Sequence, residues 1–118
     1  MRAQDGLADY GERLAERWLC QAGMVVLARR WRCPQGEIDI VARDGDCLVV
    51  CEVKTRRSLQ AGGPLEAVTP AKFARLRRLA AAWLAAHDER FAEVRIDVVA
   101  VVVPRFGAPQ IEHLAAVV

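Results

Sequence analysis

Apolar residues recur along the chain with two different periods, and these periods predict the order of helices and strands. Near the start the apolar positions have helical spacing, and Gly23 follows where a C-terminal cap would lie, which predicts a helix over about residues 4–22. A second helical pattern begins after Thr69-Pro70, an N-cap followed by a proline at the first helical position, and runs to about His87. Its buried stripe is expected to consist of Phe73, Leu76, Ala80, Trp83 and Leu84.

Extended segments fill most of the remaining chain. Residues 24–27 and 29–32 predict a first strand, and two further strands flank the polar turn at 43–46. The run 94–103 is so rich in valine that a strand covered on both faces is expected, and 111–114 is a weaker fifth segment. The resulting order predicts an α/β fold with a mixed sheet, because a strand that follows the second helix can join the sheet through a crossover.

The bulk composition fits one compact domain. The chain has 118 residues, of which 53% are hydrophobic and 27% charged, so we expect a single domain over residues 1–118 with residues 1–3 and 115–118 frayed. The longest apolar run is far shorter than the ~20 residues that a membrane span needs, and the start of the chain lacks a signal peptide. A cytoplasmic protein without membrane contact is therefore expected.

Positive charge is concentrated in the middle of the chain. The net charge is only +2, yet the segment from Lys54 to Arg78 has Glu66 as its one acidic residue. Clustered lysine and arginine suit a polyphosphate backbone, because each neutralised phosphate releases condensed counterions. A solvated helix face has the same composition, so charge alone leaves both interpretations open.

Three carboxylates and an ammonium lie inside a predicted hairpin. Residues 36–56 contain Glu37, Asp39, Glu52 and Lys54 among isoleucine, valine and cysteine. A turn centred on residues 44 and 45 would place Glu37 opposite Glu52, and Asp39 opposite Val50, with all the charged side chains on one face of the sheet.

Opposed carboxylates repel each other, and partial burial would raise their pKa values unless a cation lies between them. As diagonal neighbours, Asp39 and Glu52 would have Cβ atoms roughly 7 Å apart. Their oxygens could then converge on one Mg²⁺ with ligands at ~2.0 to 2.1 Å, and Lys54 would stand beside the ion. The other interpretation is a ladder of salt bridges on a solvated sheet face, and the spacing alone does not decide between the two.

The motif Gly36-Glu37-Ile38-Asp39, followed after a turn by Glu52-Val53-Lys54-Thr55-Arg56, resembles that of the PD-(D/E)XK nuclease superfamily. More closely, it resembles the YraN-like bacterial family, small proteins similar to archaeal Holliday junction resolvases. The resemblance covers nearly the whole chain, because residues 11–15, 64–68 and 95–99 also match the family pattern. The chain departs from the superfamily name at Ile38, where a proline would precede the aspartate.

This resemblance implies a restriction-endonuclease-like fold and a Mg²⁺- or Mn²⁺-dependent endonuclease that cleaves DNA phosphodiesters by attack of water. It assigns Asp39 and Glu52 as metal ligands, Lys54 as the catalytic lysine and Glu12 as an acid on the first helix. Glu37 would support this site or serve as an alternative ligand, and Glu16 could replace Glu12. Branched or junction DNA as substrate and a homodimeric state are likewise suggested by the resemblance alone.

DNA contacts are expected from five basic residues, namely Arg56, Arg57, Lys72, Arg75 and Arg78. A nucleic-acid-binding module that no longer cuts, or that needs a partner to complete its site, remains the alternative function. Among other residues, Trp18 is expected in the core, and Trp31 either stacks on a base or caps the sheet. Asp97 is expected to pair with a neighbouring arginine or backbone donor, and His113 to be isolated.

Overall fold

The computed structural model describes residues 3–58 and 68–117. Its elements follow the predicted order, with the weak fifth segment confirmed as a strand: α1 (Ala3–Gln21), β1 (Val25–Cys33), β2 (Gly36–Asp44), β3 (Cys47–Arg56), α2 (Pro70–Ala86), β4 (Glu93–Val102) and β5 (Gln110–Leu114). The predicted α2 start is also confirmed, because Thr69 is the N-cap and its side chain accepts a hydrogen bond from the N–H of Lys72 at 3.1 Å.

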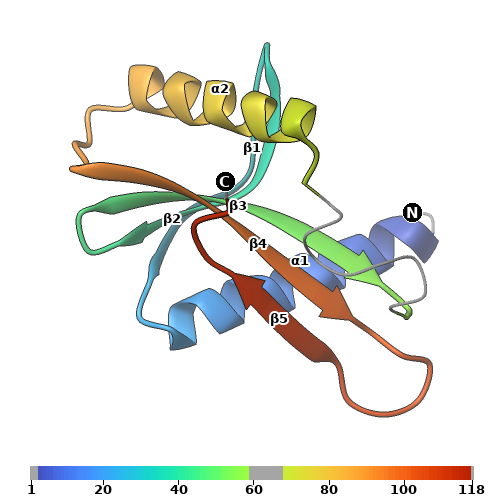
Figure 1. Ribbon diagram of the computed structural model, residues 1–118. Helices are drawn as coiled ribbons and strands as arrows, with labels where there is room; N and C mark the ends of the chain where they lie inside the picture. The colour runs from blue at the N-terminus through green and yellow to red at the C-terminus, as the bar shows by residue number, and fades with distance from the viewer. Residues whose placement is uncertain (1–2, 59–67, 118) are drawn as a thin grey trace.

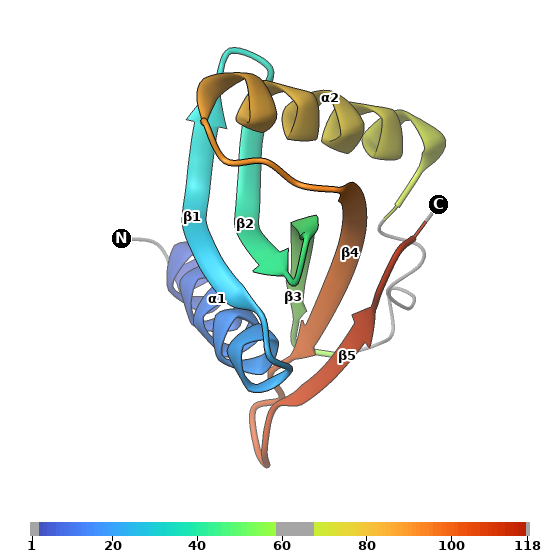
Figure 2. The same ribbon diagram turned by 90° about the vertical axis from the view of Figure 1, so that its left-hand side faces the viewer.

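The strands form one mixed sheet in the order β1-β2-β3-β4-β5. β3 and β4 are parallel, and the other neighbouring pairs are antiparallel. The parallel pair requires a crossover, which α2 provides. Figures 1 and 2 show α1 and α2 on opposite faces of the sheet, so the predicted mixed sheet flanked by helices is confirmed.

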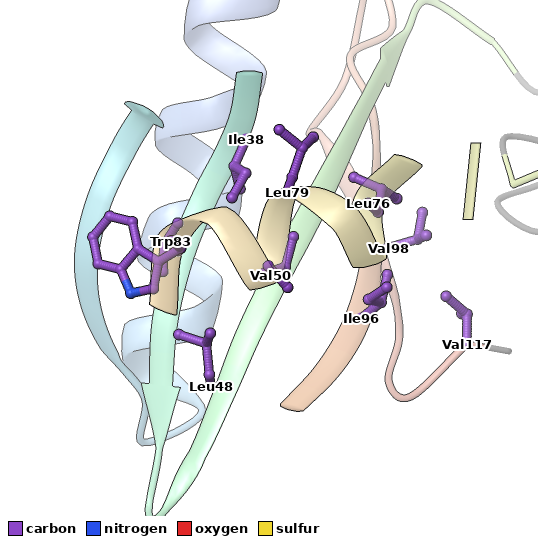
Figure 3. Packing of buried hydrophobic residues seen from close by; sticks show 11 residues of the cluster. Ile38, Leu48, Val50, Leu76, Leu79, Trp83, Ile96, Val98 and Val117 are labelled. Atoms are coloured by element: carbon purple, nitrogen blue, oxygen red, sulfur yellow. The ribbon is translucent and has the colours of Figure 1, made fainter. Parts of the chain in front are cut away.

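α2 packs on one face of the sheet. Figure 3 shows its apolar side chains turned toward β2, β3 and β4, and the labelled residues of this cluster are Ile38, Leu48, Val50, Leu76, Leu79, Trp83, Ile96, Val98 and Val117. Leu79 lies in the buried stripe although it was not in the predicted set, and Phe73 and Leu84 of that set are only partly buried.

α1 covers the other face, where Ala15 and Leu19 pack against Val49, Val99 and other residues of β2 to β4. The close approach of α1 to β3 depends on Gly11, because a Cβ atom at that position would lie 1.9 Å from Oγ1 of Thr55. The prediction that Trp18 is a core residue was wrong, since Trp18 is 38% exposed.

The first two strands are distorted at one level of the sheet. Pairing between β2 and β3 ends at Ile40 and Cys51. Ile38 belongs to the α2-side core but Ile40 to the α1-side core, so the alternation of sides along β2 breaks at Asp39 between them. Figures 1 and 2 show the tip of the β1–β2 hairpin rising beside α2.

The β2–β3 register differs from the predicted one. The hairpin closes with Asp44 opposite Cys47, and Gly45 adopts a left-handed φ of +59° in the two-residue turn. Glu37 therefore does not face Glu52, and Asp39 does not face Val50, which instead pairs with Val41. A shift of two residues by itself would keep the same side chains on each face, and it brings Asp39 level with Glu52. The break at Asp39 nevertheless places Ile38 on the opposite face from Ile40.

Val117, near the end of the described chain, is attached to β4. The N–H of Val117 donates to the carbonyl of Ile96 at 2.8 Å, and Val117 is 9% exposed. Trp31 packs edge-on against Trp83 with ring centroids 5.3 Å apart, which fits its interpretation as a cap on the sheet. In the part of the chain that the structure describes, neither helix is long and apolar enough to cross a membrane.

Candidate active site

Asp39 lies where β2 and β3 stop pairing. Its Oδ2 accepts a hydrogen bond from the N–H of Val53 at 2.8 Å, so the side chain takes the place of a missing strand–strand bond. Burial raises the pKa of Asp39 to about 7, and repulsion from Glu52 adds to this shift against the opposing effect of the Val53 bond. The carboxylates of Glu12 and Glu37 raise the same pKa to a smaller extent. Among the residues that the structure describes, no positive charge is sufficient to offset this rise in the pKa of Asp39.

Glu52 faces α2, because it follows Leu48 and Val50 at the alternating positions of β3 that face this helix. Its Oε1 pairs with Nζ of Lys72 at 3.1 Å, and the side chains are 15% and 27% exposed. By the same alternation Lys54 extends to this face beyond Glu52. The predicted catalytic lysine and Lys72 therefore approach the carboxylates from one side of the sheet.

Glu12 approaches from the opposite side, on α1. It is 9% exposed, and its Oε1 accepts a hydrogen bond from Nε of Arg30 at 2.8 Å. Arg29 lies further away, with its Nη2 3.8 Å from the same oxygen. Glu16, the alternative helical acid, is 4.0 Å from Nη1 of Arg29, so both acids belong to one cluster with arginines of β1.

Glu37 is held by a different residue. Its Oε2 lies 2.7 Å from Nε of Arg32, its cross-strand partner on β1. The repulsion that Glu37 exerts on Asp39 is the smallest of those that raise the pKa of Asp39. Glu37 therefore lies at the edge of the carboxylate centre, which we define as Glu12, Asp39 and Glu52.

The donor set fits a hard divalent cation only in part. Within residues 3–58 and 68–117, no three histidine, cysteine, aspartate or glutamate side chains are grouped closely enough to hold a metal ion. Asp39 and Glu52, however, are two repelling carboxylates at one opening of the sheet, and each keeps one oxygen outside the hydrogen bond or ion pair described above. Mg²⁺ is commonly held by one or two carboxylates with water and phosphate oxygens completing the octahedron.

The five basic residues expected to contact DNA are not equivalent. Lys72 pairs with Glu52 of the carboxylate centre, whereas Arg75 and Arg78 are exposed on α2. Nη1 of Arg57 donates to the carbonyl of Val103 at 3.3 Å, and Arg56 is partly buried at the end of β3. Of these five residues, Arg57, Arg75 and Arg78 are therefore the exposed ones.

A second charged cluster surrounds Asp97, which is fully buried. Its oxygens pair with Nε of Arg95 at 2.9 Å and with Nε2 of His113 at 2.7 Å, and Oδ1 also accepts the N–H of Ala116 at 2.9 Å. The arginine partner was predicted. The histidine was not, because β5 brings His113 to Asp97 and Trp18, and the indole N–H of Trp18 donates to its Nδ1 at 3.2 Å.

The residue that sequence reasoning missed is Arg30. A pair of arginines within an apolar strand was visible at residues 29 and 30, but their contacts with Asp9 and Glu12 require the packing of α1 against β1. The position of Lys72 beside Glu52 was also missed, because the two residues are distant in sequence and meet only when α2 folds back over β3.

The chain matches the Uncharacterised protein family UPF0102 over residues 11–101. A UPF0102 protein of Kineococcus radiotolerans is 63% identical over 118 residues, which cover 99% of this chain and 97% of the relative. A UPF0102 protein of Beutenbergia cavernae is 62% identical over 117 residues, covering 99% of each chain. A third UPF0102 protein, from Streptomyces griseus subsp. griseus, is 58% identical over 118 residues, with 99% of each chain covered.

Proposed function

Because this chain belongs to the UPF0102 family and folds around a buried carboxylate centre, we propose that it is a divalent-metal-dependent nuclease that hydrolyses DNA phosphodiesters. One observation carries the proposal. Asp39 and Glu52 meet at an opening between two strands, and burial together with their mutual repulsion raises the pKa of Asp39 to about 7. Two carboxylates that are partly buried and repel each other favour a bound cation. The assignment of the fold to the PD-(D/E)XK superfamily is part of the same proposal.

Asp39 and Glu52 would hold Mg²⁺ or Mn²⁺, with water and a phosphate oxygen as further ligands. When bound, such an ion supplies a water of lowered pKa and neutralises charge on the phosphoryl oxygens. Val53 orients Asp39 through its N–H, so one carboxylate oxygen stays turned toward the backbone while the other is left for a ligand.

Lys54 and Lys72 supply positive charge on the side of the sheet where Glu52 lies. A phosphodiester placed against this side would meet an ammonium that stabilises the negative charge that builds up on its oxygens during attack of water. Lys72 can exchange its carboxylate partner for a phosphate oxygen, because it is a flexible side chain with three donors. Glu12 adds negative charge from the α1 side and strengthens the preference of the centre for a cation.

DNA would approach along α2, where Arg75 and Arg78 are exposed and Lys72 leads into the carboxylate centre. Each phosphate contact contributes about 0.9 to the slope of log affinity against log salt for duplex DNA. Replacing both arginines with methionine should therefore lower the slope by up to about 2. The same double variant should leave Mn²⁺ binding unchanged, because neither arginine has a described contact with the carboxylate centre.

The alternative is a nucleic-acid-binding module that does not cut. It is favoured by one observation, namely that Glu52 already has Lys72 as a cationic partner and Glu12 has Arg30. Such a protein would bind DNA through the same basic residues but would show no cation-dependent change at the centre.

Metal binding and cleavage are tested separately. We expect Mn²⁺ to raise the melting temperature of the wild-type protein and to have no such effect on Asp39→Asn. Labelled single-stranded, nicked, duplex and junction DNA are then incubated with Mg²⁺ or Mn²⁺, using wild type, Glu52→Gln and Lys54→Ala. Cleavage by the wild type alone supports the nuclease. Binding by all three proteins without cleavage of any substrate, with either metal, supports the binding module and overturns the enzyme.

The assembly state is tested on the same samples. We propose a homodimer when junction DNA is bound, since two incisions require two centres, and light scattering of the free protein and of its junction complex measures this directly.

A further inference from the structure

Arg30 has a backbone conformation that is rare for a residue with a side chain. Its φ is +52°, in the left-handed region that favours glycine. It lies in the middle of β1, between Arg29, which pairs with Ile40, and Trp31, which pairs with Ile38. Arg30 is therefore level with Asp39, where the alternation of β2 side chains between the two faces of the sheet is also broken. Unfavourable backbone conformations that the surrounding structure maintains occur preferentially at functional sites.

The left-handed residue changes where two neighbouring side chains point. In a regular strand, consecutive side chains lie on opposite faces of the sheet. Here both Arg29 and Arg30 reach the same acids of α1: Arg29 Nη2 is 3.3 Å from Asp9 Oδ1, and Arg30 Nη2 is 3.0 Å from the same oxygen. The reversal at Arg30 thus adds a second guanidinium to the α1 face.

This second guanidinium acts on Glu12 more directly than the first. Nε of Arg30 donates to Glu12 Oε1 at 2.8 Å, whereas Nη2 of Arg29 lies 3.8 Å from it. Glu12 is 9% exposed, so little water screens its charge, and its repulsion is one of the causes that raise the pKa of Asp39. Without Arg30, the Glu12 carboxylate would be incompletely paired and would repel Asp39 more strongly.

We infer that Arg30 is a positioning residue of the carboxylate centre: its left-handed backbone places its guanidinium on Glu12, which holds Glu12 on the α1 side and leaves Asp39 and Glu52 to bind the cation. This inference rests on the cation site of the proposed function. It explains why Glu12 is close enough to influence Asp39 while no group of three acids forms a metal site among the residues described.

The inference predicts the direction in which the affinity for Mn²⁺ changes. Removing the positive charge of Arg30 increases the negative charge at the centre and frees Glu12 to approach the ion. Arg30→Gly suits the left-handed φ and is expected to bind Mn²⁺ about fivefold to tenfold more tightly than wild type. Arg30→Asn, a second residue type that tolerates this conformation, should show the same change.

The experiment is calorimetric titration of the metal-free protein with Mn²⁺ at pH 8, without DNA. Arg13→Gln is the matched control, because this substitution removes the same positive charge. Arg13 also pairs with Asp9 on α1, but its described contacts do not include Glu12. Arg30→Gly/Glu12→Gln should return the Mn²⁺ affinity to within about twofold of wild type. A purely structural contribution of Arg30 would not produce tighter binding that depends on Glu12.

Two kinds of failure can be told apart. If wild type binds Mn²⁺ and both Arg30 variants bind it equally or more weakly, or if Arg13→Gln matches them, the role of Arg30 is wrong and the cation site stands. If neither wild type nor the Arg30 variants bind Mn²⁺, the cation site of the proposed function is wrong, and the role of Arg30 is wrong with it. Mn²⁺ binding by the two Arg30 variants, with none detected for wild type, would support the inference.

Discussion

The N–H of Val53 donates a 2.8 Å hydrogen bond to Oδ2 of Asp39 where the pairing of β2 and β3 ends. A side chain here accepts the bond that a backbone carbonyl would accept in a continuous ladder. The strands can therefore part without leaving this N–H unpaired, and a carboxylate is fixed in the opening. The same bond lowers the pKa of Asp39, but burial and Glu52 outweigh it.

This environment predicts a pH-dependent stability of the metal-free protein. The folded-state pKa of Asp39 is raised from 3.8 to about 7, so the folded protein binds a proton that the unfolded chain releases between these values. The stability that protonated Asp39 contributes is therefore complete below pH 4 and is lost as the pH rises through 7. The loss is at most about 4 kcal/mol.

Asp39→Asn should remove this pH dependence and be more stable than wild type at pH 8 in EDTA, because an amide carries no charge and can still accept the Val53 bond. Urea unfolding from pH 4.5 to pH 8 measures the difference. Asp88→Asn, at an exposed position after α2, is the control and should follow the wild-type curve. A constant difference between Asp39→Asn and wild type over this range would contradict the assignment.

Lys72 and a metal ion would compete for Glu52. Lys72→Met removes the ammonium that lies 3.1 Å from Glu52 Oε1, so the affinity for Mn²⁺ should rise by roughly threefold to tenfold. DNA affinity should fall in the same variant, because a phosphate contact is lost. Arg75→Met, on the exposed side of α2, should weaken DNA binding without changing the Mn²⁺ affinity. Equal Mn²⁺ affinities for Lys72→Met and wild type would show that the ion pair does not oppose cation binding.

Much of the fold was predictable because the local signals agree with each other. Helical spacing, the Thr69 N-cap and the alternation in the hairpin each depend on neighbouring residues, and the structure confirms the element order that they predicted. The hairpin register was not predictable to within two residues, because Asp44-Gly45-Asp46 allows more than one turn. The pattern of buried and polar positions is unchanged by a shift of two.

The candidate site was predictable in its residues more than in its pairings. Asp39, Glu52 and Lys54 stand out as charges within an apolar hairpin, and their closeness follows from strand geometry. The ion pairs of Glu52 with Lys72 and of Glu12 with Arg30 join residues from different elements. A sequence pattern does not encode such contacts, since they depend on how the helices are placed over the sheet and on a reversal in the backbone at Arg30.

Gly11 is expected to be essential for the packing of α1 on β3. Alanine usually stabilises a helix interior by about 1 kcal/mol relative to glycine, but a Cβ on Gly11 would lie 1.9 Å from Thr55 Oγ1. Gly11→Ala should therefore lower the free energy of unfolding by roughly 2 to 4 kcal/mol. Gly6→Ala is the control on the same helix, since nothing lies within 4 Å of its added methyl group.

The cause is tested by making room on β3. Gly11→Ala/Thr55→Gly should be less destabilised than the sum of its single variants, because the clashing side chain is absent. Additive effects measured by urea unfolding would locate the effect of Gly11→Ala elsewhere. A shift of α1 should also displace Glu12, so the Mn²⁺ affinity is measured in parallel.

Asp97 is expected to hold β4, β5 and the C-terminal segment together. It is fully buried and accepts hydrogen bonds from Arg95, His113 and the N–H of Ala116, so its removal leaves several polar groups without a partner. Asp97→Ala should lower the free energy of unfolding by roughly 3 to 5 kcal/mol. Asp44 is the other carboxylate that pairs with Arg95, and its side chain is 41% exposed. Asp44→Asn should therefore lower the free energy of unfolding by less than about 1 kcal/mol. Comparable losses for the two variants in urea unfolding would contradict this role of Asp97. Because Nδ1 of His113 accepts a hydrogen bond from the indole N–H of Trp18, the ring proton is on Nε2, which donates a hydrogen bond to Asp97. His113→Phe should therefore lose both hydrogen bonds.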